Sequence, residues 1–138
     1  MATTFRLKLL TPSQTVFEQD VEFVTLPTRM GQITILPHHT ELVSILESGE
    51  LIIQHEGKRS PFAVSGGWIE MFANALVVLA DSAEHAKDID LAASEERAKK
   101  FAGELKTEAK MDMKTYSVLQ QRLAAEEARI RVATKWRG

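Results

Sequence analysis

The stretch LVVLADSAEHAKDIDLAASEERAKKFAGEL, residues 76–105, contains the point at which the spacing of apolar residues changes. Up to about Ala86, apolar residues come in short runs separated by turn-forming residues, a pattern typical of β-strands. From Asp88 onward they recur at heptad spacing with charged residues between them, which indicates an amphipathic helix. The sequence therefore predicts two domains, an all-β domain at residues 1–86 and a helical domain at residues 87–138.

The first domain is predicted to contain eight short strands. Because these strands follow one another closely and turn-forming residues separate them, they indicate a two-sheet β-sandwich. Pro27 is expected to end the second strand, and the pair Gly66-Gly67 is expected to form a turn or bulge between the sixth and the seventh. The expected strands span residues 5–10, 16–26, 32–36, 42–46, 51–55, 61–64, 68–72 and 76–80.

The second domain is predicted to be two amphipathic helices that fold back on each other as an antiparallel hairpin. The first helix begins near Asp88, with Asp88 or Asp90 as its N-cap, and ends in a turn within residues 103–112. The second helix spans residues 113–135, with Asp112 as its N-cap. The predicted fold class is therefore α+β, an N-terminal two-sheet sandwich followed by a C-terminal α-helical hairpin. The apolar stripe of the second helix consists of Tyr116, Leu119, Leu123, Ile130 and Ala133.

The composition excludes several classes of protein. The chain has 138 residues, 44% of them apolar, and no cysteine, which excludes disulfides and thiolate metal sites. No apolar run is long enough to span a membrane, and no signal peptide precedes the first strand, so we expect a soluble chain. Residues 1–85 contain 5 basic and 10 acidic residues, whereas residues 86–138 contain 12 basic and 9 acidic ones. The two domains are therefore expected to contact different partners.

The short polar motifs do not fit a catalytic or metal site. The adjacent residues His38 and His39 point to opposite sides of an extended chain, which suits a polar loop that faces a partner better than a metal site. Ser65 resembles the serine of a nucleophile elbow, but that motif needs a strand followed by a helix, and strands flank Ser65 on both sides. A third set has the residue types of a catalytic triad within five positions, although triad members normally come from separate elements. This set consists of Asp81, Ser82 and His85.

The second helix is basic, with six basic and two acidic residues from Lys114 onward. The face opposite its apolar stripe is also partly apolar. That face either remains in solvent or docks on a second surface rich in acidic and apolar groups. Nucleic acid is not expected as a partner, because the chain as a whole is acidic. The face consists of Val118, Arg122, Ala125, Arg129, Val132 and Trp136.

Four segments, in this order and spacing, carry a resemblance to a known family. They are LLTPSQTVFEQDVEFVTLPTRMGQITILPHHTELV (residues 9–43), VSGGWIEM (64–71), VVLADSAEHAKDID (77–90) and LAAEEARIRVATKW (123–136). Together they resemble the epsilon subunit of the F-type ATP synthase of bacteria and plastids, over nearly the whole chain.

The resemblance implies a non-catalytic central-stalk subunit of a proton-translocating F-type ATP synthase. Such a subunit couples the gamma subunit to the membrane rotor ring and inhibits ATP hydrolysis through its mobile C-terminal helices. The implied location is a peripheral membrane complex at the cytoplasmic face of the bacterial inner membrane, or at the stromal side of the plastid thylakoid. The alternative is a stand-alone adaptor whose sandwich and hairpin bind some other protein.

The resemblance also implies interaction sites. Pro37 would fix a docking loop and reduce the entropy lost on binding. The chain departs from the family pattern at Thr34, where a glycine is usual, and at Thr40-Glu41, where Ala-Pro is usual. The implied subunit interface comprises Gly31, Gln32, Ile33, Leu36, Pro37, His38, His39 and Leu42, and the implied inhibitory residues are Arg122, Arg129, Arg131 and Lys135.

Some members of the family bind ATP between hairpin and sandwich, and the candidate residues here are Glu84, Asp90 and Arg97. Ala93 and Ser94 replace the Arg-Ala of the family motif, which removes a guanidinium that could bind polar ligand groups. We therefore expect weak or absent ATP binding and no cofactor. The implied partners are the gamma subunit, the rotor ring and, through the second helix, the catalytic alpha/beta head, with no nucleic acid and no direct membrane insertion.

Overall fold

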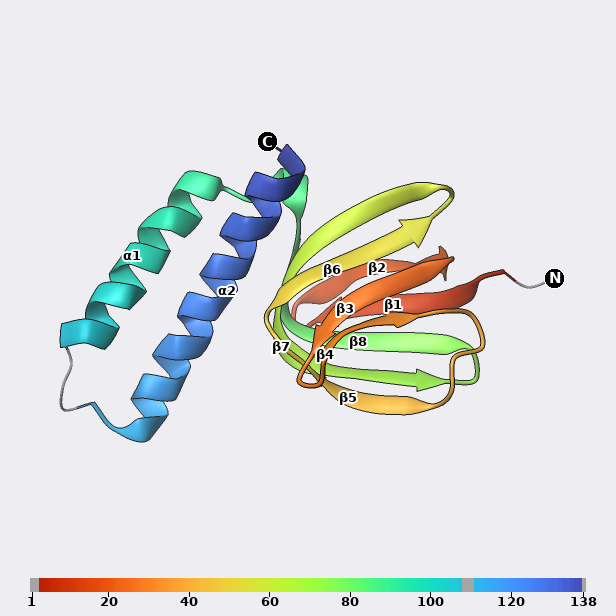
Figure 1. Cartoon of the computed structure of the whole chain (residues 1–138), viewed down its shortest axis with the longest axis horizontal. Helices are drawn as coiled ribbons and strands as arrows, with labels where there is room; N and C mark the ends of the chain where they lie inside the picture. Colours follow the sequence, from red (N-terminus) through yellow and green to blue (C-terminus); the bar gives the residue numbers. More distant parts are fainter. Residues whose placement is uncertain (1–2, 108–110, 138) are drawn as a thin grey trace.

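A computed structural model describes residues 3–107 and 111–137, in which eight strands precede one turn of 3-10 helix and two α-helices (Figure 1). The strands form a two-layered sandwich, and the helices form a hairpin at one end of it. The predicted α+β fold is therefore confirmed. The elements are β1 (Phe5–Thr11), β2 (Gln14–Val21), β3 (Phe23–Thr28), β4 (Gly31–Ile35), β5 (Leu42–Leu46), β6 (Gly49–His55), β7 (Lys58–Phe72), β8 (Ala75–His85), η1 (Ala86–Asp88), α1 (Leu91–Thr107) and α2 (Met113–Arg137).

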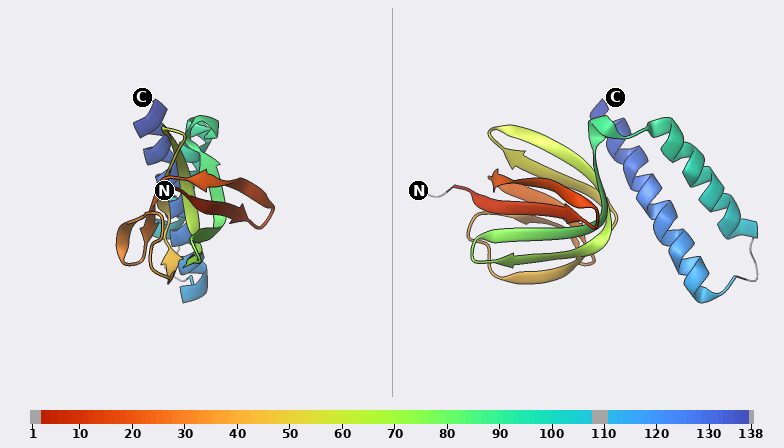
Figure 2. Two further views of the ribbon diagram at one scale, coloured as in Figure 1. Left: turned by 90° about the vertical axis from the view of Figure 1, so that its right-hand side faces the viewer. Right: turned by 180° about the vertical axis from the view of Figure 1, so that it is seen from behind.

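The strands hydrogen-bond in one continuous network, in the order β2-β1-β8-β7-β5-β3-β4, with β6 paired to β3 and β7. Strands β1 and β8 pair in parallel, with Leu7 beside Leu76, whereas the other pairs are antiparallel. The 15-residue strand β7 joins the two layers, because its first half pairs with β6 and its second half with β5. The sheet therefore folds over on itself, as two further views show (Figure 2).

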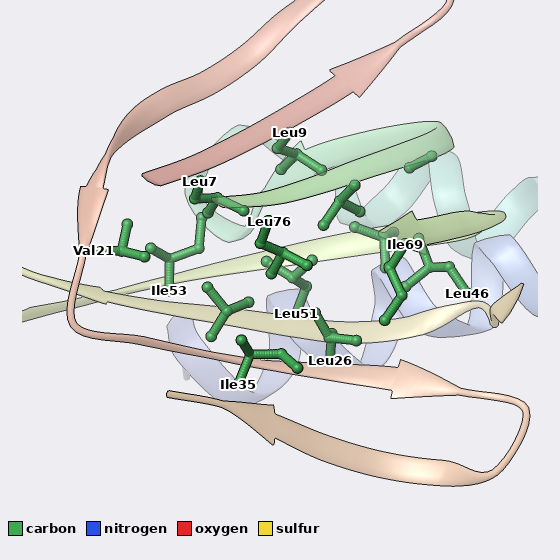
Figure 3. Packing of buried hydrophobic residues seen from close by; sticks show 14 of the residues in the cluster. Leu7, Leu9, Val21, Leu26, Ile35, Leu46, Leu51, Ile53, Ile69 and Leu76 are labelled. Carbon is green, nitrogen blue, oxygen red and sulfur yellow. The ribbon is translucent and has the colours of Figure 1, made fainter. Parts of the chain in front are cut away.

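Apolar side chains from both layers fill the space between them (Figure 3). Leu7, Leu9, Leu26, Leu51 and Ile69 are each 0% exposed. In the first half of β1, buried and exposed residues alternate one by one, as the predicted period of two requires. Burial of each such side chain contributes about 1.5–3 kcal/mol, so this core is the main source of stability.

One predicted strand is wrong. Residues 16–26 form two strands rather than one, because the chain passes from β2 in one layer to β3 in the other at Glu22. No turn residue marks this change of layer, and the Glu22 carboxylate stabilises it by accepting the Gly57 N–H at 3.0 Å. Pro27 does not end β3, because proline lacks only the N–H group, and the Pro27 carbonyl still accepts the Glu47 N–H at 3.0 Å.

The predicted turn or bulge at Gly66-Gly67 is also wrong. Strand β7 continues through both glycines, and its register with β8 stays in step, with Ser65 opposite Ser82 and Gly67 opposite Ala80. Gly67 has a φ of +138°, and a Cβ atom added there would lie 1.8 Å from the carbonyl oxygen of Leu79. Glycine is therefore required at position 67 by the close approach of β7 and β8, at the point where β7 leaves β6 and joins β5.

Both helices begin at predicted caps. The carboxylates of Asp90 and Asp112 each accept the N–H of the third residue after them, at 3.1 and 2.7 Å. Helix α1 continues through Gly103 to Thr107, farther than predicted, because packing against α2 outweighs the low helix propensity of one glycine, about 1 kcal/mol. The predicted turn at residues 103–112 includes 108–110, which lie outside the described residues.

Helix α2 packs on two sides at once, against α1 and against strands β6 and β7. Leu119 and Ala133 of its predicted apolar stripe are buried, but Tyr116, in the first turn, is 39% exposed. Val132, which was predicted on the opposite face, is also buried, in a cluster with Ala63 of β7. The second face of α2 therefore docks on the sandwich of the same chain. Neither helix, within the described residues, has a segment long and apolar enough to cross a membrane.

Candidate protein-interaction surfaces

The predicted interface loop lies between the edge strand β4 and β5, and hydrogen bonds hold it in place. His38 has a left-handed φ of 64°, and its N–H donates to Asn74 Oδ1 at 2.7 Å. Asn74, in the turn between β7 and β8, donates in turn to the Thr4 carbonyl at 3.2 Å. The His39 N–H donates to the Leu36 carbonyl at 3.1 Å. The loop is therefore fixed before any partner binds, which reduces the entropy lost on docking.

The eight predicted interface residues differ in exposure. Gly31, Gln32, Leu36 and His38 are exposed, Pro37 and His39 are half-buried, and Ile33 and Leu42 pack partly against the sandwich core. The sequence did not single out Met30, at the tip of the turn between β3 and β4, which is 88% exposed. The Thr28 hydroxyl closes this turn by donating to the Gly31 carbonyl at 2.7 Å and accepting the Met30 N–H at 3.1 Å.

A second surface, which the sequence analysis missed, is an apolar face on the outside of strands β5, β7 and β8. Ile45, Trp68 and Leu79 lie in one row across these strands, because Ile45 pairs with Trp68 and Trp68 pairs with Leu79. Trp68 is 48% exposed and the other members lie between 39% and 63%. The sequence signal was that most residues on both faces of β5 and of the end of β7 are apolar, with Glu70 as an exception, where a half-buried strand would alternate with polar residues. We define the apolar face as Val43, Ile45, Trp68, Phe72 and Leu79.

The apolar face includes an open groove of about 510 Å³ beside Trp68. Ile45 and Leu79 line it together with Pro12, which follows β1. Gly67 of β7 also lines the groove. Several exposed apolar side chains beside a groove are typical of a protein-interaction site.

A third feature is a network of charged groups between the hairpin and the sandwich. Glu126 of α2, whose side chain is 7% exposed, accepts hydrogen bonds from Arg97 of α1 and Arg129 of α2, both at 2.9 Å. Arg129 also lies 3.4 Å from the Glu84 carboxylate and donates to the Ser82 hydroxyl at 3.0 Å, both on β8. We call these five residues the arginine network. It connects both helices to the end of β8.

The pKa of Glu126 is lowered within this network. Burial alone would raise it, but the hydrogen bonds and charges of Arg97 and Arg129 outweigh burial. The hydrogen bond to Glu126 raises the pKa of Arg97. Glu126 is therefore ionised at neutral pH, and removing either arginine would leave a buried carboxylate with one partner fewer.

The four predicted inhibitory residues of α2 have different positions. Arg129 belongs to the arginine network, and the Lys135 ammonium contacts the Glu50 carboxylate of β6 at 3.0 Å. Arg122 is exposed and lines a cleft of about 640 Å³ between α2 and the sandwich, whereas Arg131 is exposed on the helix surface. Two of the four side chains therefore contact the sandwich when the hairpin is docked.

The three candidate ATP-site residues each have a partner within the chain. Glu84 and Arg97 belong to the arginine network, and the Asp90 carboxylate caps α1. Ser94, at the replaced motif position, is 0% exposed, and its hydroxyl accepts a hydrogen bond from Arg97 at 3.3 Å. Intramolecular contacts therefore engage all three candidate side chains, and weak or absent ATP binding remains a prediction.

The three residues with the types of a catalytic triad do not assemble into one. The Ser82 hydroxyl shares a 2.6 Å hydrogen bond with the Ser65 hydroxyl, whereas Nδ1 of His85 accepts the Lys87 N–H at 3.1 Å and caps η1. Burial and the neighbouring charge of Lys87 lower the pKa of His85, so its ring is neutral at neutral pH. Within the described residues, no cluster of His, Asp and Glu is arranged to hold a metal ion.

Comparisons with known proteins agree with this architecture. A family described as the beta-sandwich domain of the ATP synthase delta/epsilon chain matches residues 4–86. Over 128 residues, 92% of this chain and 90% of the relative, the chain is 38% identical to the ATP synthase epsilon chain of Chloroflexus aggregans. It is 46% identical over 99 residues to that of Desulforamulus reducens, a match that covers 72% of each chain.

Two solved structures have the same fold. One is a chain of the OSCP/F1/c-ring part of the Euglena gracilis mitochondrial ATP synthase, with a TM-score of 0.77, 18% identity and coverage of 93% of this chain and 80% of that one. The other is a chain of the central stalk and c-ring of the Tetrahymena thermophila mitochondrial enzyme, with a TM-score of 0.61, 17% identity and coverage of 94% and 93%. At these identities the similarity concerns the fold.

Proposed function

From the premise that this chain belongs to the ATP synthase epsilon family, and is a non-catalytic subunit of the rotary complex, we propose that its sandwich couples the gamma subunit to the membrane rotor ring. The proposal rests on the exposed apolar face, whose members lie outside the buried core cluster of the sandwich. Trp68 would be the central contact with gamma, because a large aromatic side chain beside a groove is a typical binding hot spot.

The pre-organised loop is proposed to contact the rotor ring. Leu36 and His38 are exposed in this loop, and the His38 N–H donates to Asn74 Oδ1, which holds the loop in one conformation. An ordered loop loses little entropy when it binds. The complex would then lie at the cytoplasmic face of a bacterial inner membrane, or at the stromal side of a plastid thylakoid.

The hairpin is proposed to inhibit ATP hydrolysis by leaving the sandwich and contacting the catalytic alpha/beta head. Its basic residues, Arg122, Arg129, Arg131 and Lys135, would then face acidic helices of the head. In favour of such a movement, the apolar contact between hairpin and sandwich is small, since three of the five buried residues in it are alanines.

ATP is proposed to bind weakly or not at all, and an NMR titration with millimolar ATP, observed at Glu84, Asp90 and Arg97, tests this.

Two experiments with three variants test the proposed function. Trp68→Ser should reduce recovery of a gamma coiled coil at least tenfold, because removing a hot-spot aromatic typically costs 2 kcal/mol or more, while Tyr116→Ser, at an exposed aromatic of α2, should not. Deletion of residues 113–138 should leave assembly intact and raise ATP hydrolysis by the assembled enzyme. Equal recovery of gamma by both serine variants would favour the stand-alone adaptor, and unchanged hydrolysis would show that the hairpin does not inhibit.

A further inference from the structure

The C-terminal end of α2 contacts one carboxylate of the sandwich with two different donors. The indole N–H of Trp136 donates to Glu50 Oε2 at 2.6 Å, and the Lys135 ammonium donates to Oε1 at 3.0 Å. Glu50 lies in β6, and its side chain is 20% exposed. Each carboxylate oxygen thus has its own donor from the helix. Hydrogen bonds to a charged, partly buried group are stronger than those between neutral groups.

The last turn of α2 also contacts the connection between the two domains. The Arg137 guanidinium donates to the backbone carbonyls of Ala86 and Ile89, which lie between β8 and α1. These two carbonyls and the Glu50 carboxylate lie on the sandwich side of the junction. Three consecutive residues, Lys135 to Arg137, therefore supply polar contacts to the sandwich and its connection.

The apolar part of the same junction is small. Ala63, Ala86, Ile89, Val132 and Ala133 form a buried cluster, and Leu91 and Trp136 pack partly against it. Three alanines contribute little apolar area, so burial alone stabilises the docked position only weakly. Polar contacts must therefore supply much of the preference for docking.

Only some of these polar contacts would be lost if the hairpin moved as a unit. Glu126 contacts Arg97 and Arg129, and all three lie on the two helices, so these bonds remain in a hairpin that has left the sandwich. The contacts that cross the junction are those of Arg129 with β8, those of Glu50 with Trp136 and Lys135, and those of Arg137 with the Ala86 and Ile89 carbonyls. Movement of the hairpin is therefore controlled at its junction contacts and not at Glu126.

We propose that Glu50 is a latch residue that sets the resting position of the hairpin, and that Trp136 is the side chain it holds. Opening the latch separates a carboxylate from an indole N–H and an ammonium group, with no change inside either domain. The inference concerns the isolated chain and does not depend on the proposed role in the rotary complex.

The test uses the full-length chain with Trp68→Phe, which leaves Trp136 as the only tryptophan. Glu50→Ala should expose Trp136, shifting its emission to longer wavelength and increasing its quenching by acrylamide. Because the chain has no cysteine, Lys58→Cys on the sandwich and Lys99→Cys on α1 can be labelled for a distance measurement. Loss of two charge-assisted hydrogen bonds should raise the ratio of undocked to docked chains about tenfold or more.

Two further variants make the test specific. Glu50→Gln retains an acceptor for the indole but loses the charge that attracts Lys135, so it should open the hairpin less than Glu50→Ala. Glu56→Gln, an exposed carboxylate just after β6, should leave both readouts unchanged. An unchanged distance in Glu50→Ala would overturn the proposal. So would a change accompanied by loss of far-ultraviolet helical signal, because Glu50 would then stabilise the helix itself and not its position.

Discussion

In the sandwich, a single buried cluster of seventeen apolar residues joins all eight strands, whereas the cluster between sandwich and hairpin, among the described residues, contains five, three of them alanines. The hairpin compensates with charge, through the arginine network and the contacts of Glu50. Apolar contacts do not titrate and are not screened by salt, but contacts between partly exposed charges depend on both pH and ionic strength. We therefore expect the stability of the sandwich core to depend less on salt and pH than the position of the hairpin does.

The largest expected effect comes from the sandwich core. Leu51→Ala removes a side chain that is 0% exposed and should lower the free energy of unfolding by about 2–5 kcal/mol. Leu79→Ala, on the apolar face at 39% exposure, is the matched control and should change it by no more than about 0.5 kcal/mol. Urea unfolding followed by circular dichroism measures both. Similar losses in the two variants would mean that the apolar face contributes to folding and is not reserved for a partner.

An intermediate effect is expected within the hairpin. Glu126→Gln removes the charge between Arg97 and Arg129, and hydrogen exchange should show the opening free energy of α1 and α2 amides falling by about 1–3 kcal/mol. Amides of β7 should keep their protection. Glu127→Gln, its exposed neighbour, is the control and should have little effect. If both variants lowered protection equally, the arginine network would not be what holds the two helices together.

The effect of Glu126 also has a predictable pH dependence. Because its pKa in the folded chain lies below the usual value of 4.5, its contribution is complete above that value and is lost as the pH falls through the folded pKa. The difference between wild type and Glu126→Gln should therefore shrink on acidification below about pH 4.5. A difference that grew in acid would contradict the direction of the shift.

The smallest expected effect is at His85, between the two domains. Because its pKa is lowered, the neutral ring caps η1 fully above pH 6.5, and this contribution is lost as the pH falls through the folded pKa. Between about pH 7 and pH 5, wild type should become less stable relative to His85→Asn, whose amide can cap without titrating. Thermal unfolding at several pH values measures this, with the exposed His38→Asn as control. Parallel pH profiles of wild type and His85→Asn would contradict the proposed cap.

Local patterns predicted much of this fold. Alternation in β1 and the caps at Asp90 and Asp112 involve neighbouring residues only, so the sequence contains the required information. The change of layer at Glu22 was missed because no turn residue marks it. The apolar face was missed because strands that are apolar on both sides look fully buried. The structure gives the exposure of the predicted interface residues, and their role in binding remains a prediction.

The arginine network could not be predicted, because its members are far apart in the chain. Arg97 contacts a glutamate 29 positions away, and Ser82 contacts an arginine 47 positions away. Single-sequence patterns describe neighbours along a helix or strand, and they contain no information on which charged side chains meet across a junction. The same limit applies to Glu50, which lies 86 positions before Trp136.

The parallel pairing of β1 with β8 has a consequence for biosynthesis. Strand β1 can pair with β8 only after β8 has been synthesised, since Arg6 lies opposite Ala75. The core of the sandwich therefore cannot form completely until almost all of the sandwich has left the ribosome. Nascent chains released before residue 75 should therefore be digested readily by protease, and those extending past residue 86 should resist. The helices follow the sandwich in the chain, so they are synthesised when the sandwich has become able to receive them.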